Sequence, residues 1–302
     1  MTERSEVIIG LSTLRAQPRG AGLRHDRAKR GHHWAQHARS GRNPAERGCV
    51  MNAKLVTDTG IVFNRELRPL VRDPFTVVFG LIQPLIFLGL FAPLLTAMTG
   101  LDTAASLQWF VPGVLVMLSL FGTSTTGANL ISEMQTGSHE RQLVTPLHRS
   151  ALLIGRALKE IAPTIVQAVV VIAVTVPFGF RPSVVGVLVG LAVLAVFSVG
   201  MGALSYSLAL AVKNTDWLFW VVQQTLLFPM LILAGMLLPL DGAPGWLRAA
   251  AHVNPLSYVV DAERLLFDGD IWNGTVAAGA IAAMVTATAG IWIGVRAMRR
   301  AT

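Results

Sequence analysis

One stretch of charged and polar residues lies between long apolar segments and is the part of the sequence best suited to chemistry or docking. It runs from Glu133 to Glu160 and reads EMQTGSHERQLVTPLHRSALLIGRALKE. Its centre has the spacing of a short amphipathic helix, because Leu143, Val144 and Leu147 share one face and charged residues surround them. Such a helix is suited to a groove on another protein. The alternative is a helix that lies on anionic lipid.

Motifs of common enzymes are missing from the sequence. It contains no GxxxxGK[ST] loop and no HExxH or GxSxG motif, which argues against ATP binding through a P-loop and against a membrane protease or lipase. The histidines of the N-terminal part lack the Cys/His spacing of a zinc site, and Cys49 is the single cysteine. We therefore predict that the chain is not an enzyme and carries no catalytic residue, metal ligand or cofactor.

Composition places the chain in a membrane. The sequence is 53% hydrophobic and only 14% charged, with a mean hydropathy of +0.56, whereas soluble domains have about 25% charged residues. A helix needs about 20 apolar residues to cross a bilayer. We predict an all-α polytopic membrane protein with six transmembrane helices, at about residues 75–98, 109–131, 161–180, 184–212, 217–240 and 276–295.

Basic residues between the spans predict their orientation. With a cytoplasmic N-terminus, 12 Lys and Arg residues after residue 51 fall on the cytoplasmic side, whereas only Arg181, Arg248 and Arg264 fall outside. Positive charge collects in cytoplasmic loops, so both termini and the Glu133–Glu160 loop are predicted to be cytoplasmic. We expect the plasma membrane of a bacterium, since Arg outnumbers Lys 21 to 4.

The segment Asp241–Asp270 is partly apolar but carries several charges. A charge at the bilayer centre costs at least about 2.5–3.5 kcal/mol, so this segment is not expected to span. Asn254 followed by Pro255 predicts a helix start. We predict two short helices that form an extracytoplasmic cap between spans five and six, in or on the outer leaflet.

The interiors of the six predicted spans hold no Asp, Glu, Lys, Arg or His, which disfavours a proton-coupled carrier and mildly favours an apolar cargo. An ion-coupled secondary transporter remains the alternative, because neutral groups also bind Na⁺. Neutral polar side chains do occur in the spans. They either form hydrogen bonds between helices or line a substrate path, for which the candidates are Gln83, Asn129, Gln167, Gln223 and Gln224.

Two separated motifs of the chain resemble the type-2 ABC exporter permeases, most closely the daunorubicin/doxorubicin-resistance branch. The first is Glu133 followed by TGSHERQLVTPLHR, which is similar to the family's acidic residue, its GTxERLLVTP core and a following Arg; Ser138 and Gln142 depart from that pattern. The second is LAGMLLPLDGAPGWLRAAAHVNPLSYVVDAERLL, Leu233–Leu266, which is similar to the family's signature around the fifth span and the outer helices. The resemblance covers about Phe63–Arg300.

The resemblance implies roles for three groups of residues. The polar loop is then a coupling helix that docks into a separate ATPase, with Glu133, Glu140, Arg141, Gln142, Thr145, Pro146 and Arg149. The segment FNRELRPLVRDP, Phe63–Pro74, is then an amphipathic interface helix on the inner leaflet, with Asn64, Arg65, Glu66, Arg68 and Arg72. The outer cap then gates release and is anchored by Asn254, Pro255, Tyr258, Asp261 and Arg264.

The same resemblance implies an ATP-driven exporter in which ATP and Mg bind to the partner ATPase, expected in two copies. Six spans imply a second permease copy, either identical or related, and membrane lipid is the remaining partner; nucleic acid is not expected. Relatives of this kind handle amphipathic drugs, cell-envelope lipids or glycolipids, and undecaprenyl-linked polysaccharides. The substrate therefore stays open at this point.

Residues 1–50 differ from the remainder of the chain. They hold 10 Lys/Arg and 4 Asp/Glu and few large apolar residues, so they cannot bury enough surface to offset the entropy of ordering. We predict a disordered basic tail, followed by a permease domain over residues 51–302. Three interpretations of the tail stay open: it binds anionic lipid or nucleic acid through its charge, its histidines bind metal, or translation begins at Met51.

Overall fold

The computed structural model describes residues 44–72, 74–100, 102–138, 149–213, 215–236 and 242–300. The chain divides into two units, Met1–Met51 and Asn52–Thr302. In the first unit, the described residues 44–51 are helical, and they open helix α2 (Pro44–Arg72). Residues 44–50 had been assigned to the disordered tail; proline is favoured in the first turn of a helix, so a helix start at Pro44 is physically reasonable. Residues 1–43 lie outside the described part of the chain.

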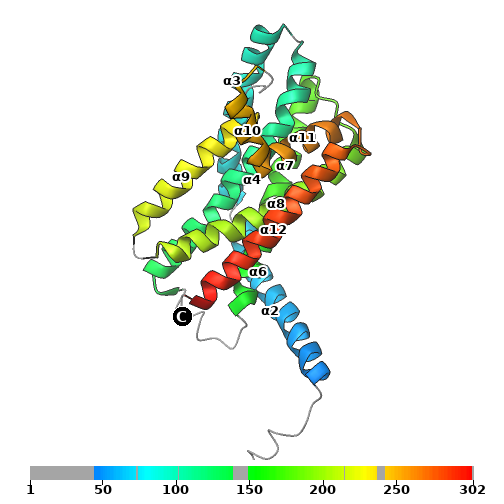
Figure 1. Ribbon diagram of the computed structural model, residues 1–302. Coiled ribbons are helices and arrows are strands. Elements are labelled where there is room, and N and C mark those ends of the chain that lie inside the picture. The colour runs from blue at the N-terminus through cyan, green and yellow to red at the C-terminus, as the bar shows by residue number, and fades with distance from the viewer. Residues whose placement is uncertain are drawn as a thin grey trace, which may run out of the picture. The chain divides into compact units, whose positions relative to one another are not determined.

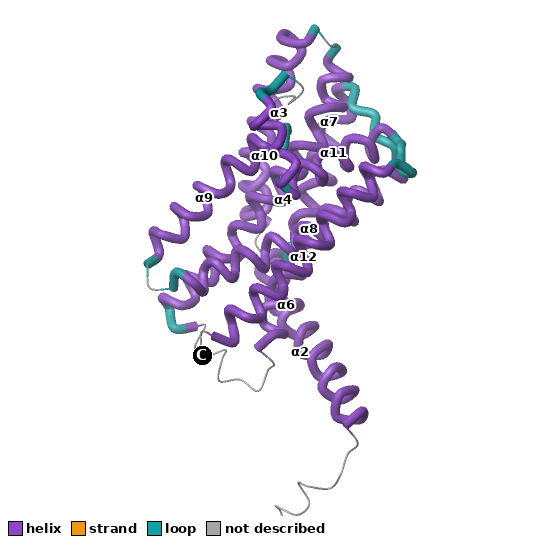
Figure 2. Tube along the Cα trace, viewed as in Figure 1, coloured by secondary structure: helices purple, strands orange, loops and turns teal. Residues whose placement is uncertain are grey.

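Every regular element described in the second unit is a helix (Figure 2). In chain order they follow α2 as α3 (Pro74–Thr99), α4 (Thr103–Gln135), α6 (Arg149–Lys159), α7 (Ile161–Thr175), the 3₁₀ turn η1 (Val176–Phe178), α8 (Val184–Ala211), α9 (Asp216–Leu233), α10 (Gly245–Val253), α11 (Pro255–Asp268) and α12 (Gly274–Arg300).

Six of the described helices are long and apolar enough to cross a membrane, which confirms the predicted number of spans. Their bounds are Val78–Ala97, Thr103–Gln135, Ser150–Phe178, Val184–Ala211, Asp216–Leu233 and Gly274–Arg300. The predicted cytoplasmic side of both termini stays a prediction. Several helical segments extend beyond the predicted spans: α4 covers Thr103–Gln135, and the third segment begins at Ser150. Where these helices enter and leave the membrane stays a prediction. Glu133, Arg156, Lys159 and Glu160 belong to these extended helical segments but lie outside the spans predicted from the sequence.

Helix α8 is the centre of the second unit, since it packs against α4, α6, α7, α11 and α12. Its contact with α12 brings backbone against backbone (Figure 1). A Cβ atom added to Gly200 would lie 2.6 Å from the backbone nitrogen of Ala287, and one added to Gly290 would lie 2.4 Å from the carbonyl oxygen of Gly200. Close approach through small residues is the usual way in which membrane helices gain packing energy.

The helices differ in how much of their apolar surface the unit covers. All side chains of α4 from Phe110 to Leu120 are buried. Helix α3, by contrast, exposes Phe79, Ile86, Leu90 and Leu94 at helical spacing. This apolar face is suited to lipid tails or to another membrane helix, as the prediction of a multi-pass protein requires.

The segment between α9 and α12 forms the two short helices that were predicted. Asn254 Oδ1 accepts a hydrogen bond from the backbone N–H of Leu256 at 3.1 Å, and Pro255 occupies the first turn of α11, which confirms the predicted helix start. One face of helix α11 is part of the bundle. It packs against α4, α8 and α12, and Leu256, Val259 and Phe267 are fully buried.

Candidate functional site

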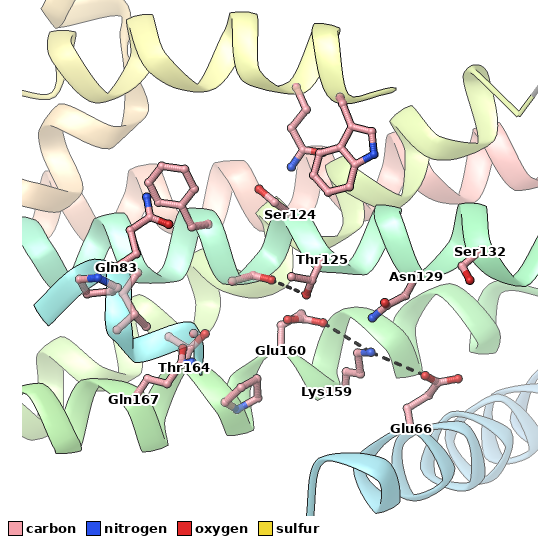
Figure 3. Close-up of a pocket in the computed structure, with 18 of the residues that line it drawn as sticks. Glu66, Gln83, Ser124, Thr125, Asn129, Ser132, Lys159, Glu160, Thr164 and Gln167 are labelled. Atoms are coloured by element: carbon pink, nitrogen blue, oxygen red, sulfur yellow. Dashed lines mark hydrogen bonds and ion pairs between the residues drawn. The ribbon is translucent and has the colours of Figure 1, made fainter. Parts of the chain in front are cut away.

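A cavity of about 630 Å³ opens between α2, α3, α4, α7 and α9 (Figure 3). The five neutral residues that the sequence nominated for a substrate path all line it: Gln83, Asn129, Gln167, Gln223 and Gln224. They come from four different helices, so only the packing brings them together. Gln223 is buried, and its side-chain oxygen has no hydrogen-bond partner among the described residues. Such unpaired buried groups are exceptions that need an explanation, and a functional role is one of them.

The remaining lining of the cavity is mixed. Aromatic and aliphatic surface comes from Leu118, Phe121 and Trp220, and further polar groups come from Ser124 and Thr164. Ligand pockets typically have 300–1,000 Å³ and combine apolar walls with a few placed polar groups. The volume and the lining of this cavity match a site for a drug-sized amphipathic molecule.

One end of the cavity is charged. We refer to Glu66, Glu133, Arg156, Lys159 and Glu160 as the ionic cluster. Arg156 Nε lies 3.4 Å from Glu66 Oε1, and the same guanidinium contacts the carboxylate of Glu133. Lys159 Nζ lies 3.7 Å from Glu66 Oε2 and 3.8 Å from Glu160 Oε1. Figure 3 shows Lys159 between Glu66 and Glu160.

Two further side chains hold the ionic cluster against the bundle. Thr126 of α4 donates a hydrogen bond of 2.6 Å to Glu160 Oε1. The guanidinium carbon of Arg156 lies 5.6 Å from the centre of the Tyr206 ring on α8, a cation–π contact. Arg156 and Glu160 are 3% and 2% exposed, and buried charges need such partners to offset their lost hydration. The cluster therefore joins α2, α4, α6, α7 and α8.

The side chains nominated for the interface helix divide into two groups within α2. Asn64, Arg65, Arg68 and Arg72 are exposed, whereas Glu66 turns inward to the ionic cluster and lines the cavity. This arrangement leaves a basic outer face on α2 and connects its inner face to the bundle.

The residues predicted to anchor the outer cap form hydrogen bonds and a cation–π contact with residues at the ends of α9 and α4. Asn254 Nδ2 donates to the carbonyl of Met230 at 2.7 Å. Arg264 donates to the carbonyls of Gly235 at 2.9 Å and Trp109 at 3.2 Å, and its guanidinium lies 4.0 Å from the centre of the Trp109 ring. Pro255 begins α11, Tyr258 donates to the carbonyl of His252 at 2.9 Å, and Asp261 lies 3.4 Å from Arg264.

The residues nominated for coupling are only partly described. Glu133 belongs to the ionic cluster. Arg149 is the first residue of α6, and nothing is stated of its side chain. Glu140, Arg141, Gln142, Thr145 and Pro146 lie outside the described residues, so the coupling helix stays a prediction.

Sequence reasoning missed most of the ionic cluster. Arg156, Lys159 and Glu160 stand at i, i+3 and i+4, which places them on one face of a helix, and this spacing was the available signal. Their partners on α2 and α4 could not be identified from it. Among the described residues, no group of three or more His, Cys, Asp or Glu side chains is arranged to hold a metal ion.

Comparison with known proteins gives a family match over most of the chain. The model of the ABC-2 type transporter family matches residues 57–267. The putative transport permease ycf38 of Cyanophora paradoxa is 28% identical over 236 residues, which cover 76% of this chain and 81% of that protein. The daunorubicin resistance ABC transporter permease protein DrrB1 of Streptomyces coeruleorubidus is 26% identical over 198 residues, 65% of this chain and 70% of that protein.

A further relative is the probable doxorubicin resistance ABC transporter permease protein DrrC of Mycobacterium tuberculosis. It is 28% identical over 243 residues, which cover 79% of this chain and 85% of that protein. The family match over residues 57–267 therefore spans the helices that form the cavity, the ionic cluster and the cap.

Proposed function

Because this chain belongs to the ABC-2 type transporter family of membrane permeases, we propose that it is the membrane subunit of an ATP-driven exporter of hydrophobic or amphipathic molecules. The observation that supports this proposal is the cavity of about 630 Å³, which is lined by Trp220, Phe121 and Leu118 together with amide and hydroxyl groups. A molecule with an apolar body and a few polar groups fits such a lining. Two relatives are named for resistance to daunorubicin or doxorubicin, which makes such drugs the first substrates to test.

ATP hydrolysis is assigned to a partner. The sequence lacks a P-loop, so the proposal requires a separate ATPase that binds ATP and Mg, in two copies, together with a second permease chain. We place the docking site for the ATPase in the predicted coupling segment, with Glu140 and Arg141 at its centre. The plasma membrane of a bacterium is the proposed location, and substrate leaves on the side of the outer cap.

The arrangement of the ionic cluster supports a route from the ATPase to the cavity. Helix α6 follows the coupling segment directly, and Arg156 and Lys159 of α6 pair with Glu66 of α2. Glu66, Lys159 and Glu160 also line the cavity. A displacement of the coupling segment would therefore move charged groups at the cavity's own wall.

Reconstitution tests the proposal. The full chain and the ATPase that purifies with it would be placed in liposomes, and ATP-dependent movement of daunorubicin would be measured. We expect transport, and we expect the Glu140→Ala/Arg141→Ala variant to lose drug-stimulated ATP hydrolysis while it still inserts and folds. Lys213→Ala, a change of an exposed basic residue in another turn, is the matched control and should retain activity.

Three results would count against all or part of the proposal. Full stimulated ATPase activity in the double variant would remove the coupling role. Transport by the chain alone, driven by an ion gradient without any ATPase, would instead support the ion-coupled carrier. Movement of a polysaccharide or glycolipid but no drug would keep the ATP-driven mechanism and replace the substrate.

A further inference from the structure

Helix α11 carries a carboxyl group that no described contact satisfies. Glu263 is 0% exposed, and neither of its carboxyl oxygens has a hydrogen-bond partner. Native proteins leave few buried polar groups unpaired, because each one retains the cost of its lost hydration. Glu263 is therefore an exception to the rule that buried polar groups are paired, and this exception needs a physical explanation.

Helices α8 and α12 pack against α11 (Figure 1), and glycines allow both to approach it closely. A Cβ atom added to Gly190 of α8 would lie 2.4 Å from Glu263 Oε2, and one added to Gly186 would lie 1.6 Å from the carbonyl oxygen of Leu266. On the other side, a Cβ added to Gly279 of α12 would lie 2.6 Å from the carbonyl oxygen of Tyr258. These contacts leave the carboxyl group in a narrow space between α8 and α12, with no surface exposed to solvent.

Within the described ranges, no opposite charge pairs with Glu263 to replace the lost water. The ionisable residues of α11 and α4 are engaged elsewhere: Asp261 with Arg264, Asp268 with Gln108, and Glu133 with Arg156. The others on the elements packed against α11 or in its flanking turns are Asp102, Arg181, Tyr206, Asp216, Arg248, His252, Tyr258, Asp270, Arg296, Arg299 and Arg300. None of them perturbs Glu263, since burial alone raises its pKa from 4.5 to about 8.

We propose that Glu263 is a proton-binding site that holds the cap closed: the protonated side chain allows α11 to pack between α8 and α12, and loss of the proton releases it. A neutral carboxyl group tolerates an apolar crevice far better than a carboxylate does. When α11 separates from α8, water reaches the group and its ordinary pKa returns. Opening of the cap is then coupled to release of one proton.

The pKa of Glu263 in the closed and in the open cap determines how the stability of the closed state changes with pH. The pKa of Glu263 is raised in the closed cap, so the closed state is fully favoured below about pH 4.5 and loses stability as pH rises toward 8. Release of one proton on opening makes the opening equilibrium constant grow by up to about tenfold per pH unit in that window. Above about pH 8 the constant levels off.

The consequence for transport rests on the proposed function. Asn254 and Arg264 connect the cap to the end of α9 through hydrogen bonds to backbone carbonyls. Helix α9 in turn contributes Trp220, Gln223 and Gln224 to the cavity. Release of α11 would therefore free one wall of the substrate site. Binding or loss of the proton at the cap would set when that wall moves.

Hydrogen exchange of the full chain in nanodiscs tests the proton site without any transport assay. Exchange of peptides from residues 255–268 would be followed by mass spectrometry between pH 5 and pH 9.5. A peptide from residues 161–175 of α7, which takes no part in the proposed separation of α11 from α8, would be the internal reference for intrinsic rates. We expect the opening constant of α11, relative to that reference, to rise steeply and level off near pH 8. Glu263→Gln stays neutral at every pH and should give a flat profile.

Asp268→Asn is the matched control, because Asp268 is an exposed carboxylate on the same helix. It should reproduce the wild-type profile. A flat wild-type profile would overturn the proposal, and so would an unchanged pH dependence in Glu263→Gln. Should Glu263→Gln fail to fold, infrared spectra of the wild type decide: a protonated carboxyl band that persists at pH 7 and disappears near pH 8 supports the site, and its absence at pH 7 rejects it.

Discussion

Arg156 of α6 and Glu66 of α2 form an ion pair, with 3.4 Å between Nε and Oε1, and this pair connects two parts of the chain that the sequence assigns to different tasks. Glu66 lies in the predicted interface helix, and Arg156 follows the predicted coupling segment. Both residues belong to the ionic cluster at the end of the cavity. The pair is thus a physical connection between the proposed ATPase side of the protein and the proposed substrate site.

The first prediction concerns Arg156→Gln. The change leaves Glu66 and Glu133 near each other without their shared cation, and removal of one partner from a buried ion pair typically costs about 3–5 kcal/mol. We expect the free energy of unfolding to fall by an amount near the lower end of this range, because the Glu133 side chain is 26% exposed. Denaturant unfolding of the purified chain in detergent would measure this change in stability.

Two further variants make that test specific. Arg296→Gln removes another guanidinium that lies over an aromatic ring, 5.5 Å from the centre of Trp292, but one that is exposed, and it should change stability little. Adding Glu66→Gln to Arg156→Gln should restore part of the loss. Equal stability of Arg156→Gln and the wild type would contradict a structural role for the cluster.

The second prediction concerns Gly186→Ala on α8. The new Cβ would lie 1.6 Å from the backbone oxygen of Leu266, which cannot rotate away, so α11 must shift. Overpacking of this kind costs about 1–3 kcal/mol. We expect a lower unfolding temperature and faster hydrogen exchange in α11. Gly89→Ala on α3 is the control, because nothing lies within 4 Å of its added Cβ and alanine favours a helix by up to about 1 kcal/mol.

Features that depend only on the residues of one segment could be predicted from the sequence. Each transmembrane helix carries its signal in its own run of about 20 apolar residues, so the number of spans is confirmed. The start of α11 was predictable for the same reason, since Asn254 and Pro255 define it locally. A neutral amide in an apolar span needs a partner, and this rule selected Gln83, Asn129 and Gln167 before any packing was known.

Features that depend on distant segments could not be predicted. The amphipathic stripe of α11 predicts a helix with one buried face, but how closely that face packs depends on Gly186 and Gly190 of α8 and Gly279 of α12. The ionic cluster likewise depends on helices that only the fold brings together, such as α2 and α6. Glu160 lies directly before the predicted third span, and its burial is tolerated because it pairs with Lys159.

The third prediction concerns Arg264→Lys in the cap. The planar guanidinium donates to the carbonyls of Trp109 and Gly235 at the same time and stacks on the Trp109 ring. A lysine ammonium group cannot make both hydrogen bonds and the stacking contact together. Hydrogen bonds to charged groups are worth about 1.5–3 kcal/mol, so we expect a loss of about 1–3 kcal/mol. Hydrogen exchange in residues 230–236 and 255–268 should rise together. Arg248→Lys, exposed on α10, should leave both segments unchanged, and unchanged exchange in Arg264→Lys would show that the cap is held by other contacts.

The fourth prediction concerns Gly122→Phe, which adds a benzyl group to the wall of the cavity. Gly122 lines the cavity, and nothing lies within 4 Å of an added Cβ, so the new ring can enter the space without displacing the backbone. It would occupy volume that an amphipathic substrate needs. We expect at least about tenfold weaker daunorubicin binding, equivalent to about 1.4 kcal/mol, with an unfolding temperature close to that of the wild type.

Gly89→Phe is the matched control for this prediction, because Gly89 is also a helical glycine with open space around it but does not line the cavity. It should bind and transport the drug normally. Binding would be measured on the purified chain, and transport in liposomes with the ATPase. Normal binding by a folded Gly122→Phe variant would place the substrate outside the cavity. Loss of transport with normal binding would instead show that the new ring obstructs a helix movement, because the two measurements separate occupancy of the site from the conformational change that follows it.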